Sequence, residues 1–214
     1  MADDIYLAQR QVGPMQNFVY LIGDPQSREA AVVDPGWEPS TILRTLEADG
    51  YRLTAAFVTH HHFDHVGALG ELLAAADIPV YVHRADAPAV PVPPSSLRPV
   101  EDGDIVRIGQ VPVRLLHTPG HTPGSQCLVV GHRLFSGDTL FIQACGRWDL
   151  PGGDPGQLYD SLTGKLKTLD EGTVLYPGHN YADRPTSTIG QEKRTNPFLQ
   201  VPSREAFLRM AARG

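Results

Sequence analysis

The sequence predicts an α/β fold in which two mixed β-sheets pack face to face and carry helices on their outer faces. Three observations predict it: short apolar runs punctuated by Gly and Pro, a meander of strands at the start of the chain, and strands that alternate with helices further on. Such elements bury their apolar faces between two sheets and leave the helices outside. The pattern occurs in two similar halves, which fits two such sheets packed face to face.

Strands and helices alternate in the first half of the chain. Apolar runs that end at turn residues predict four strands, at 17–23, 30–33, 54–58 and 79–83. Apolar residues at helical spacing predict a helix at 40–49, capped by Ser40 or Thr41, and another from about His65 to Ala76. The five prolines within 84–99 predict a long surface loop, which is either a lid or an inert connection.

Hairpins dominate the middle of the chain. They pair 105–108 with 111–116 and 126–130 with 133–136. Asp154 and Pro155 begin a helix that runs through Leu166, because proline favours the first helical position. A strand at 174–176 follows, then a helical stretch up to about Arg194 and an amphipathic turn from Ser203 with Phe207 and Leu208 facing inward.

Length and charge limit the domain count and the partners. A chain of 214 residues suits one domain with a sizeable core, which we divide into a domain at 1–200 and a short C-terminal helical tail at 201–214. Eighteen basic against twenty-four acidic residues give a net charge of −6 without runs of like charge, which argues against a nucleic-acid surface. The oligomeric state stays open.

The compartment follows from the N-terminus and the cysteines. The first ten residues lack a basic stretch followed by an apolar core, and no apolar run approaches the roughly 20 residues of a membrane span. Cys127 and Cys145 are too few for a disulfide framework, so we interpret both as reduced thiols. We expect a cytoplasmic protein without membrane partners.

The stretch THHHFDH at 59–65 predicts a metal site directly after an apolar strand. Side chains two apart in an extended segment project to the same side, so His60 and His62 can bind one ion while Asp64 and His65 point toward a second. Imidazole and carboxylate are ligands that zinc, iron and manganese accept. By the same alternation His61 faces the other way, as a packing residue. Histidines that merely cap the following helix are the alternative.

Three further candidate ligands follow short apolar runs and sit beside Gly or Pro, as expected of side chains on tight turns at strand ends. They are His121 in TPGHTPGS, Asp138 in FSGDTLF and His179 in YPGHNY. With these motifs the chain resembles the metallo-β-lactamase superfamily from about residue 15 to about residue 200. Within it, the chain is similar to the glyoxalase II (hydroxyacylglutathione hydrolase) branch.

The resemblance implies an αβ/βα sandwich with the metals at one edge between the sheets. It implies that the first metal is bound by His60, His62 and His121, the second by Asp64, His65 and His179, and that Asp138 bridges them. Thr59 and Asp34 each end a strand that enters this cleft, which makes them candidates for orienting the ligands. His117 precedes a ligand turn and is a candidate for orienting a metal-bound group.

Two divalent ions about 3.5 to 4 Å apart lower the pKa of a bridging water and so supply hydroxide at neutral pH. The resemblance therefore predicts a dinuclear hydrolase of thioesters such as S-D-lactoylglutathione, with Asp64 and Asp138 in the catalytic centre. Zinc is our first choice of metal, with iron or manganese as alternatives. Cys145 is an unsupported nucleophile, because no second motif supplies it with a base.

Other members of the superfamily give alternatives. A persulfide dioxygenase with one iron held by His60, His121 and Asp138 is the second hypothesis, because CGRWD at 145–149 resembles that family's CGRTD. Phe63 and Gly178 depart from the alanines usual there. A β-lactamase or a non-catalytic metal-binding module is a third, although β-lactamases have cysteine or serine where this chain has Asp138.

A glutathione clamp is only partly represented in the sequence. In glyoxalase II a basic residue after a Cys-Gly pair, a tyrosine two residues after the last histidine ligand, and basic residues on a C-terminal helix hold glutathione. Arg147 and Tyr181 match the first two and are our candidate substrate-binding residues. For the third, the tail offers Arg204, Arg209 and Arg213. We therefore expect a small-molecule thioester substrate, with weak binding if it is glutathione-based.

Overall fold

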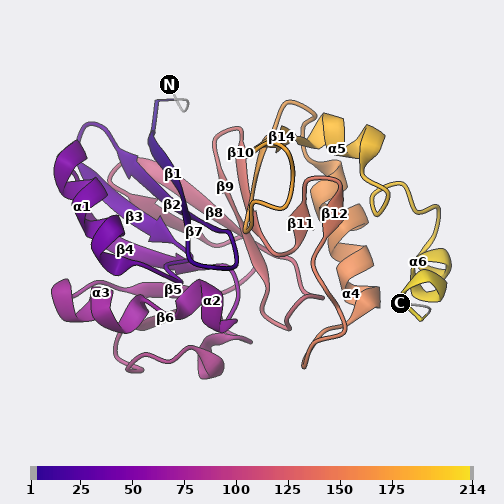
Figure 1. Ribbon diagram of the computed structural model, residues 1–214, viewed down its shortest axis with the longest axis horizontal. Helices are drawn as coiled ribbons and strands as arrows, with labels where there is room; N and C mark the ends of the chain where they lie inside the picture. The colour runs from indigo at the N-terminus through magenta and orange to yellow at the C-terminus, as the bar shows by residue number, and fades with distance from the viewer. Residues whose placement is uncertain (1–3, 213–214) are drawn as a thin grey trace.

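The computed structural model describes residues 4–212 as two six-stranded sheets packed face to face (Figure 1). The first sheet has the order β1-β2-β3-β4-β5-β6; its first three strands form an antiparallel meander, and β3 to β6 run parallel. Its strands are β1 (Tyr6–Val12), β2 (Asn17–Asp24), β3 (Glu29–Val33), β4 (Arg52–Val58), β5 (Val80–His83) and β6 (Leu97–Val100).

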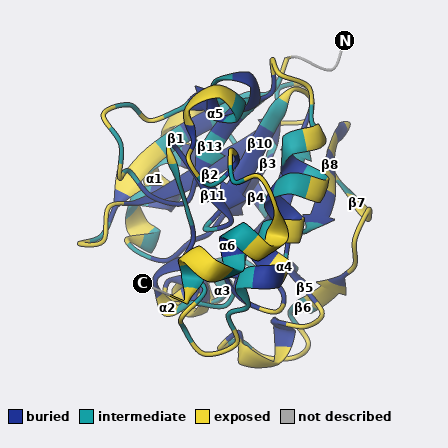
Figure 2. Cartoon of the chain, turned by 90° about the vertical axis from the view of Figure 1, so that its right-hand side faces the viewer, coloured by how far each residue is buried: buried dark blue, intermediate teal, exposed yellow. Residues whose placement is uncertain are grey.

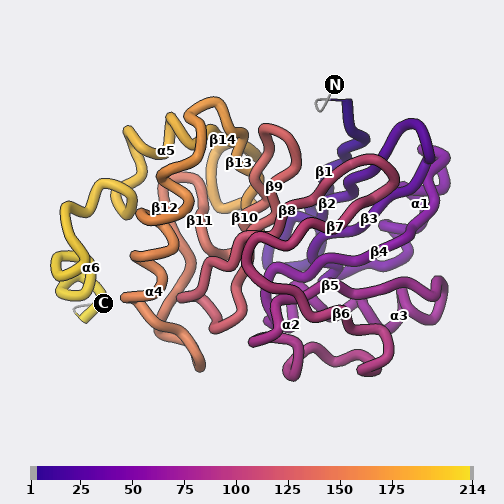
Figure 3. Tube along the Cα trace, turned by 180° about the vertical axis from the view of Figure 1, so that it is seen from behind, coloured from indigo at the N-terminus to yellow at the C-terminus, as the bar shows by residue number. Residues whose placement is uncertain are grey.

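The second sheet has the order β14-β13-β10-β9-β8-β7, with one parallel pair between β10 and β13. Seen from behind, β7 and β8 cross in front of the first sheet (Figure 3). Its strands are β7 (Ile105–Ile108), β8 (Val111–His117), β9 (Gln126–Val130), β10 (Arg133–Gly137), β13 (Val174–Pro177) and β14 (Ser187–Thr188). A small hairpin of β11 (Leu140–Phe141) and β12 (Ala144–Cys145) lies beside it.

Three apolar layers hold the sandwich together. The middle layer interleaves residues of the two sheets, such as Phe57 from β4 and Phe135 from β10, both fully buried. The first outer layer lies under α1 (Pro39–Asp49) and α3 (Leu69–Ala75), and the second lies under α4 (Pro155–Asp160), α5 (Ile189–Thr195) and α6 (Arg204–Ala211). Figure 2 shows buried strands beneath helices with exposed outer faces. The predicted fold class, two mixed sheets with helices outside, is confirmed.

The predicted helix from His65 to Ala76 is wrong in one respect, because it is two helices. The structure has α2 (Phe63–Val66) and then α3, with Gly67 and Ala68 between them. The amide of Ala68 donates to the carbonyl of Pro35, and a Cβ at Gly67 would lie 2.8 Å from the carbonyl oxygen of Gly36. Close contact with the loop at 35–36 therefore interrupts the helix, a tertiary effect that helical periodicity does not reveal.

Two other expectations need correction. The segment 84–99 is not all loop, because it contains a short 3-10 turn (Ala87–Ala89) and the first residues of β6, an edge strand where proline is tolerated. Helix α1 begins at Pro39 after Glu38, so neither Ser40 nor Thr41 caps it. At the other end of the chain, Phe207 is fully buried as expected, while Leu208 is half-buried.

The helix that begins after Asp154 follows the prediction. The Asp154 carboxylate accepts a hydrogen bond from the amide of Gln157, and Pro155 takes the first helical position. Beyond α4 the helical path continues through Ser161–Lys165 and Leu166–Thr168, so that Leu158, Leu162 and Leu166 are buried together. No helix within residues 4–212 is both long enough and apolar enough to cross a bilayer.

Candidate metal centre

The seven predicted ligand side chains converge at one edge of the sandwich, between the two sheets. Each comes from the segment that follows a strand, so the strands of both sheets deliver them to the same place. His60, His62, Asp64 and His65 follow β4, His121 follows β8, Asp138 follows β10 and His179 follows β13. The amide of Phe18 donates to the carbonyl of Gly178 at 2.8 Å, which ties the start of β2 to the His179 turn.

The side chains form two groups of three. His60, His62 and His121 can each offer a ring nitrogen within 4.8 Å of the other two, and His62 Nδ1 lies 3.0 Å from His121 Nε2. Asp64, His65 and His179 form the second group within the same limit, with 3.2 Å between the Nε2 atoms of His65 and His179. These are the two triads that the family resemblance implied.

Asp138 lies between the two groups. Its Oδ2 atom is 3.6 Å from His121 Nε2 in the first group and 3.3 Å from His179 Nε2 in the second. Its Oδ1 atom is 3.4 Å from His65 Nε2. One carboxylate thus reaches both groups, which is the position of a bridging ligand.

Hydrogen bonds at the far side of three of the rings orient the nitrogen that points into the cluster. His121 Nδ1 donates to the carbonyl of Arg147 at 2.7 Å, and His179 Nδ1 donates to the carbonyl of Met15 at 2.9 Å. His65 Nδ1 lies 3.0 Å from Asp34 Oδ2, an acceptor. In each neutral ring the Nε2 lone pair therefore points into the cluster, as metal-bound histidines require.

His60 is oriented in the same way through Thr59. The Thr59 hydroxyl donates to Asp34 Oδ2 at 2.6 Å, so it is left to accept the proton of His60 Nδ1 at 3.0 Å. The amide of Thr59 also donates to Asp34 Oδ1. Asp34 and Thr59, expected to orient ligands, hold His60 and His65 with Nε2 turned inward.

The donor set fits divalent cations. His60 Nε2 and Asp138 Oδ1 are buried without a hydrogen-bond partner in the described part of the chain. The Nε2 atoms of His65 and His179 face each other at 3.2 Å, so either a proton or a cation must lie against them. Buried polar atoms that lack a protein partner need one of another kind. Five imidazoles and two carboxylates suit zinc, iron or manganese.

The pKa values of the cluster reflect its burial and its charges. Burial lowers the pKa of His60 well below its ordinary value, and burial with the neighbouring His121 lowers that of His62 to about 4. Burial opposes ionisation of Asp64 and Asp138, but contacts with His65 outweigh it and the pKa of each carboxyl is lowered. Burial also opposes ionisation of His65 and His179, but the neighbouring carboxylates, Asp138 foremost, outweigh it and raise the pKa of both rings. In the metal-free cluster His65 and His179 therefore hold protons that a cation would displace, because histidine binds metals as neutral imidazole.

Several residues that the sequence did not single out position the ligands. Asn17 donates from its amide nitrogen to Asp64 Oδ2 at 2.8 Å, and Trp37 Nε1 donates to Asn17 Oδ1 at 3.0 Å. Asp86 accepts hydrogen bonds from both loops that carry the first group. These partners lie 20 or more positions from the residues they contact, so no local motif reveals them.

The other histidines lie outside the two groups. His61 points away from His60 and His62 as the alternation predicted, with its Nδ1 atom 2.9 Å from Asp86. His117 Nε2 donates to the carbonyl of Pro123, and its ring stacks on His83 with 3.7 Å between ring centroids. The His117 ring therefore contacts the turn that carries His121 and the ring of His83.

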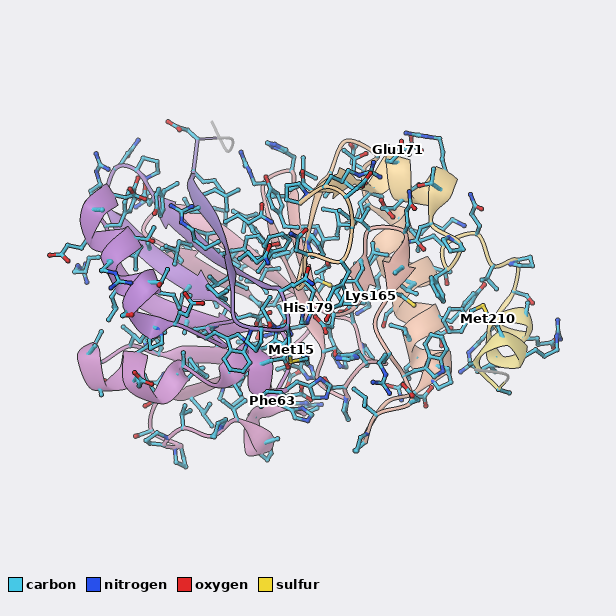
Figure 4. All side chains as sticks on the ribbon, in the orientation of Figure 1. Met15, Phe63, Lys165, Glu171, His179 and Met210 are labelled. Carbon is cyan, nitrogen blue, oxygen red and sulfur yellow. The ribbon has the colours of Figure 1, made fainter. Side chains whose placement is uncertain are left out.

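Exposed apolar side chains surround the metal cluster. Of the five large apolar side chains that are exposed in residues 4–212, Phe63 and Tyr181 belong to segments that carry candidate ligands, and Met15 belongs to the turn between β1 and β2 that contacts His179. The Tyr181 ring stacks on His179 at 4.6 Å between centroids, and the carbonyl of Met15 accepts from His179. Figure 4 shows Met15, Phe63 and His179 gathered near the centre of the molecule.

The cationic candidates lie in different places. Arg147, exposed, makes a two-pronged contact with Asp149, while its backbone carbonyl holds His121. In α6, Arg204 pairs with Asp160 and Arg209 lies 3.9 Å from Glu205. Met210 marks α6 at one end of the molecule, away from His179 near the centre (Figure 4). Arg213 lies outside the described residues.

Neither cysteine has the surroundings of a nucleophile. Both are free thiols, and burial raises the pKa of Cys127 to about 11. Burial also raises the pKa of Cys145. A thiol whose pKa is raised is a poor source of thiolate.

The sequence and the fold have clear relatives. The profile of the Metallo-beta-lactamase superfamily matches residues 12–179. The hydroxyacylglutathione hydrolase of Alkalilimnicola ehrlichii is 42% identical over 192 residues, which are 89% of this chain and 72% of that protein. ETHE1 from Myxococcus xanthus superposes with a TM-score of 0.88 at 36% identity and covers 97% of this chain and 90% of its own. TTHA1623, solved in a di-iron-bound form, superposes with a TM-score of 0.79 at 39% identity over 90% of this chain and 100% of its own. The chain belongs to the metallo-beta-lactamase superfamily.

Proposed function

We propose that this protein is a dinuclear metal-dependent hydrolase of thioesters. The observation that carries the proposal is the pair of donor groups with the Asp138 carboxylate between them, 3.6 Å from His121 Nε2 and 3.3 Å from His179 Nε2. His60, His62 and His121 would hold one ion, Asp64, His65 and His179 would hold the other, and Asp138 would contact both. Zinc is the first choice, and the same donors accept iron or manganese.

When bound, such a pair of ions supplies a water of lowered pKa as the nucleophile and an electrophile for the scissile carbonyl. The chain itself holds the geometry. Asp138 and Asp64, which we propose as the catalytic carboxylates, are kept ionised by His65 and its neighbours. Asp34 and Thr59 bind the outer nitrogens of His60 and His65, so that the inner nitrogens are the ones that would bind the ions.

The apolar rim supports a small acyl-thiol substrate. Tyr181 stands beside His179 with more than half of its surface exposed, and Phe63 is exposed between His62 and Asp64. Flat apolar surfaces at the mouth of a polar site bind the non-reacting parts of a substrate. We propose Tyr181 and Arg147 as substrate-binding residues, with the Arg147 guanidinium exchanging Asp149 for a substrate carboxylate.

The tail supports weak binding of glutathione. Helix α6 packs on α4, where its Phe207 lies in the apolar layer with Leu158 and Leu162. Its arginines face Asp160 and Glu205 and not the metal cluster. A glutathione thioester would therefore miss charge-assisted contacts worth roughly 1.5 to 3 kcal/mol each. We accordingly infer that the enzyme tolerates thiols other than glutathione.

A second candidate, a persulfide dioxygenase with one iron on His60, His121 and Asp138, is favoured by the superposition on ETHE1 and by the CGRWD segment. Gly178 weighs against it. An alanine there, as the dioxygenase pattern has, would place its Cβ 2.3 Å from Asp138 Oδ1, so the carboxylate could not keep its present position between the groups.

The two functions are separated by paired assays. Thioester hydrolysis measured without oxygen, with one thiol released per acid, is the result expected. Oxygen uptake that depends on glutathione persulfide, with negligible thioester cleavage, would establish the dioxygenase instead. Metal analysis of protein purified without added metal accompanies both assays, with two ions per chain expected. The two free thiols support a cytoplasmic location, which we also propose.

A further inference from the structure

Asp86 is a buried carboxylate outside the seven candidate ligands, and it contacts both loops that carry the first group. It lies in the turn after β5, within the proline-rich segment, and is 1% exposed. Its Oδ2 atom accepts from the amide of His61 at 3.0 Å and from the hydroxyl of Thr122 at 2.7 Å. Its Oδ1 atom accepts from the amide of Gly124 at 2.6 Å.

These donors are neighbours of the first-group ligands. His61 stands between His60 and His62, and Thr122 follows His121. Two of the three donors are backbone amides, so Asp86 holds the path of the chain and not just side-chain orientation. One carboxylate therefore sets the separation between the loop at 59–65 and the turn at 118–125.

The residues around Asp86 allow its carboxylate to come close to the backbone at Gly124. A Cβ at residue 124 would lie 2.5 Å from Asp86 Oδ1, so glycine is needed there for the carboxylate to reach the backbone. The His61 ring adds an ion-pair contact at 2.9 Å. Burial alone would raise the pKa of Asp86, but the His61 and Thr122 contacts outweigh it and lower the pKa. The carboxylate is thus ionised, with a donor for each oxygen.

The second group is held by a different set of residues. Asp34 bonds to His65, and Asn17 bonds to Asp64. Neither contact involves Asp86. The two groups therefore have separate supports, although Asp34 also reaches His60 through Thr59.

We propose that Asp86 is a positioning residue for the first metal group: it brings His121 to the distance from His60 and His62 at which the three can share one ion. This inference rests on the proposed dinuclear function. It assigns a task to the proline-rich segment 84–99, which connects β5 to β6 and at the same time fastens the two ligand loops.

The test compares metal binding by Asp86→Asn and Asp86→Ala with that by the wild type, each dialysed against a graded series of metal-chelator buffers. Loss of a residue that orients ligands typically weakens metal binding about 10- to 100-fold. We expect the variants to bind one ion with wild-type affinity and the other with an affinity that is about 10- to 100-fold lower. Circular dichroism and a urea midpoint show that each variant is folded.

Two matched controls isolate the effect. Asp102→Asn alters another carboxylate, which accepts from the amide of His117 and pairs with Lys165 without touching either ligand loop. His61→Ala removes the ring contact but leaves the backbone donor to Asp86. Both controls should retain two ions. To identify which ion is released, Asp86→Ala is combined with His179→Ala, in which the second group is incomplete. In this background Asp86→Ala should lower the affinity for the ion that remains in the first group.

The outcomes are decisive in each direction. Two ions held at wild-type strength by Asp86→Ala would overturn the inference, as would equal weakening of both ions. A wild type with one ion would refute the dinuclear function, and the Asp86 comparison would still decide the inference. If Asp86→Ala binds the single ion more weakly than Asp102→Asn does, the positioning role of Asp86 is supported. If the two variants bind the ion equally, the positioning role is overturned.

Discussion

Replacing Gly178 by alanine tests the position of Asp138 with the addition of a single methyl group. The new Cβ would lie 2.3 Å from Asp138 Oδ1 and 2.9 Å from the backbone carbon of Gly137. Contacts of a Cβ below 3.0 Å are essentially never observed, so the carboxylate must retreat by about 0.7 Å. Ligand distances at metal sites tolerate about 0.2 Å. The shift is thus several times larger than a bridging ligand can absorb.

The expected result is a large loss of rate without loss of the fold. Misplacement of a reacting group by about 1 Å costs about 100-fold in rate. We therefore expect kcat/KM for thioester hydrolysis to fall about 100-fold in Gly178→Ala and one ion to bind more weakly. Steady-state kinetics and metal analysis of the same preparation measure the two effects.

Gly70→Ala is the matched control. A Cβ at Gly70 would meet no atom within 4 Å, and the residue lies in helix α3, where alanine stabilises by roughly 0.5–1 kcal/mol relative to glycine. This variant should keep full activity and both ions. If Gly178→Ala behaves like Gly70→Ala, the carboxylate does not act from the position seen here and our reasoning about Asp138 is refuted.

Three further predictions concern the bridge, the thiol and the pH. Asp138→Ala should lose bound metal and most of the thioesterase activity, whereas His61→Ala should keep its metal content; loss of an ion from the His61 variant would contradict our assignment of that side chain. The KM for glutathione thioesters should be one to two powers of ten above that of an enzyme with a full glutathione clamp. A shorter thioester that lacks the glycine of glutathione should therefore have a similar KM, and a hundredfold higher KM would show that the clamp is intact. Burial, and then the neighbouring His117, lower the pKa of His83 from 6.5 to about 4, so the folded protein binds fewer protons than the unfolded chain between these values. His83 should therefore contribute fully to the free energy of unfolding of the metal-free protein above pH 6.5 and contribute less as the pH drops toward 4. The fall in this free energy between pH 7.5 and 4.5, measured by urea titrations, should be smaller in His83→Gln than in the wild type. An equal fall in the two proteins would contradict this prediction.

The candidate ligands could be predicted because their signals are local. Four of the seven lie within residues 60–65, and the other three each follow an apolar run and stand beside glycine. Strand and hairpin positions were predictable for the same reason, since turn residues separate the apolar runs. The structure then brings together side chains that are as far apart as His65 and His179.

What could not be predicted depends on contacts between distant segments. The break between α2 and α3 arises from the loop at 35–36, and β6 forms because β5 offers a parallel edge to a segment full of prolines. Asp86 resembles any surface aspartate in sequence, yet it is buried between two loops. Asn17 gives no sign of its bond to Asp64. Such roles exist only once the sheets have packed.

The outer strands of the two sheets have a consequence for the behaviour of the protein at high concentration. The first sheet ends at β1, with exposed Arg10 and Gln11, and at β6, which contains Arg98 and Pro99. The second ends at β7, with exposed Arg107, and at the two-residue β14. Charge, proline and shortness at an edge all discourage a foreign strand from adding to a sheet. Each of the four edges thus carries at least one feature that opposes edge-to-edge aggregation, even though Ile105 on β7 is exposed.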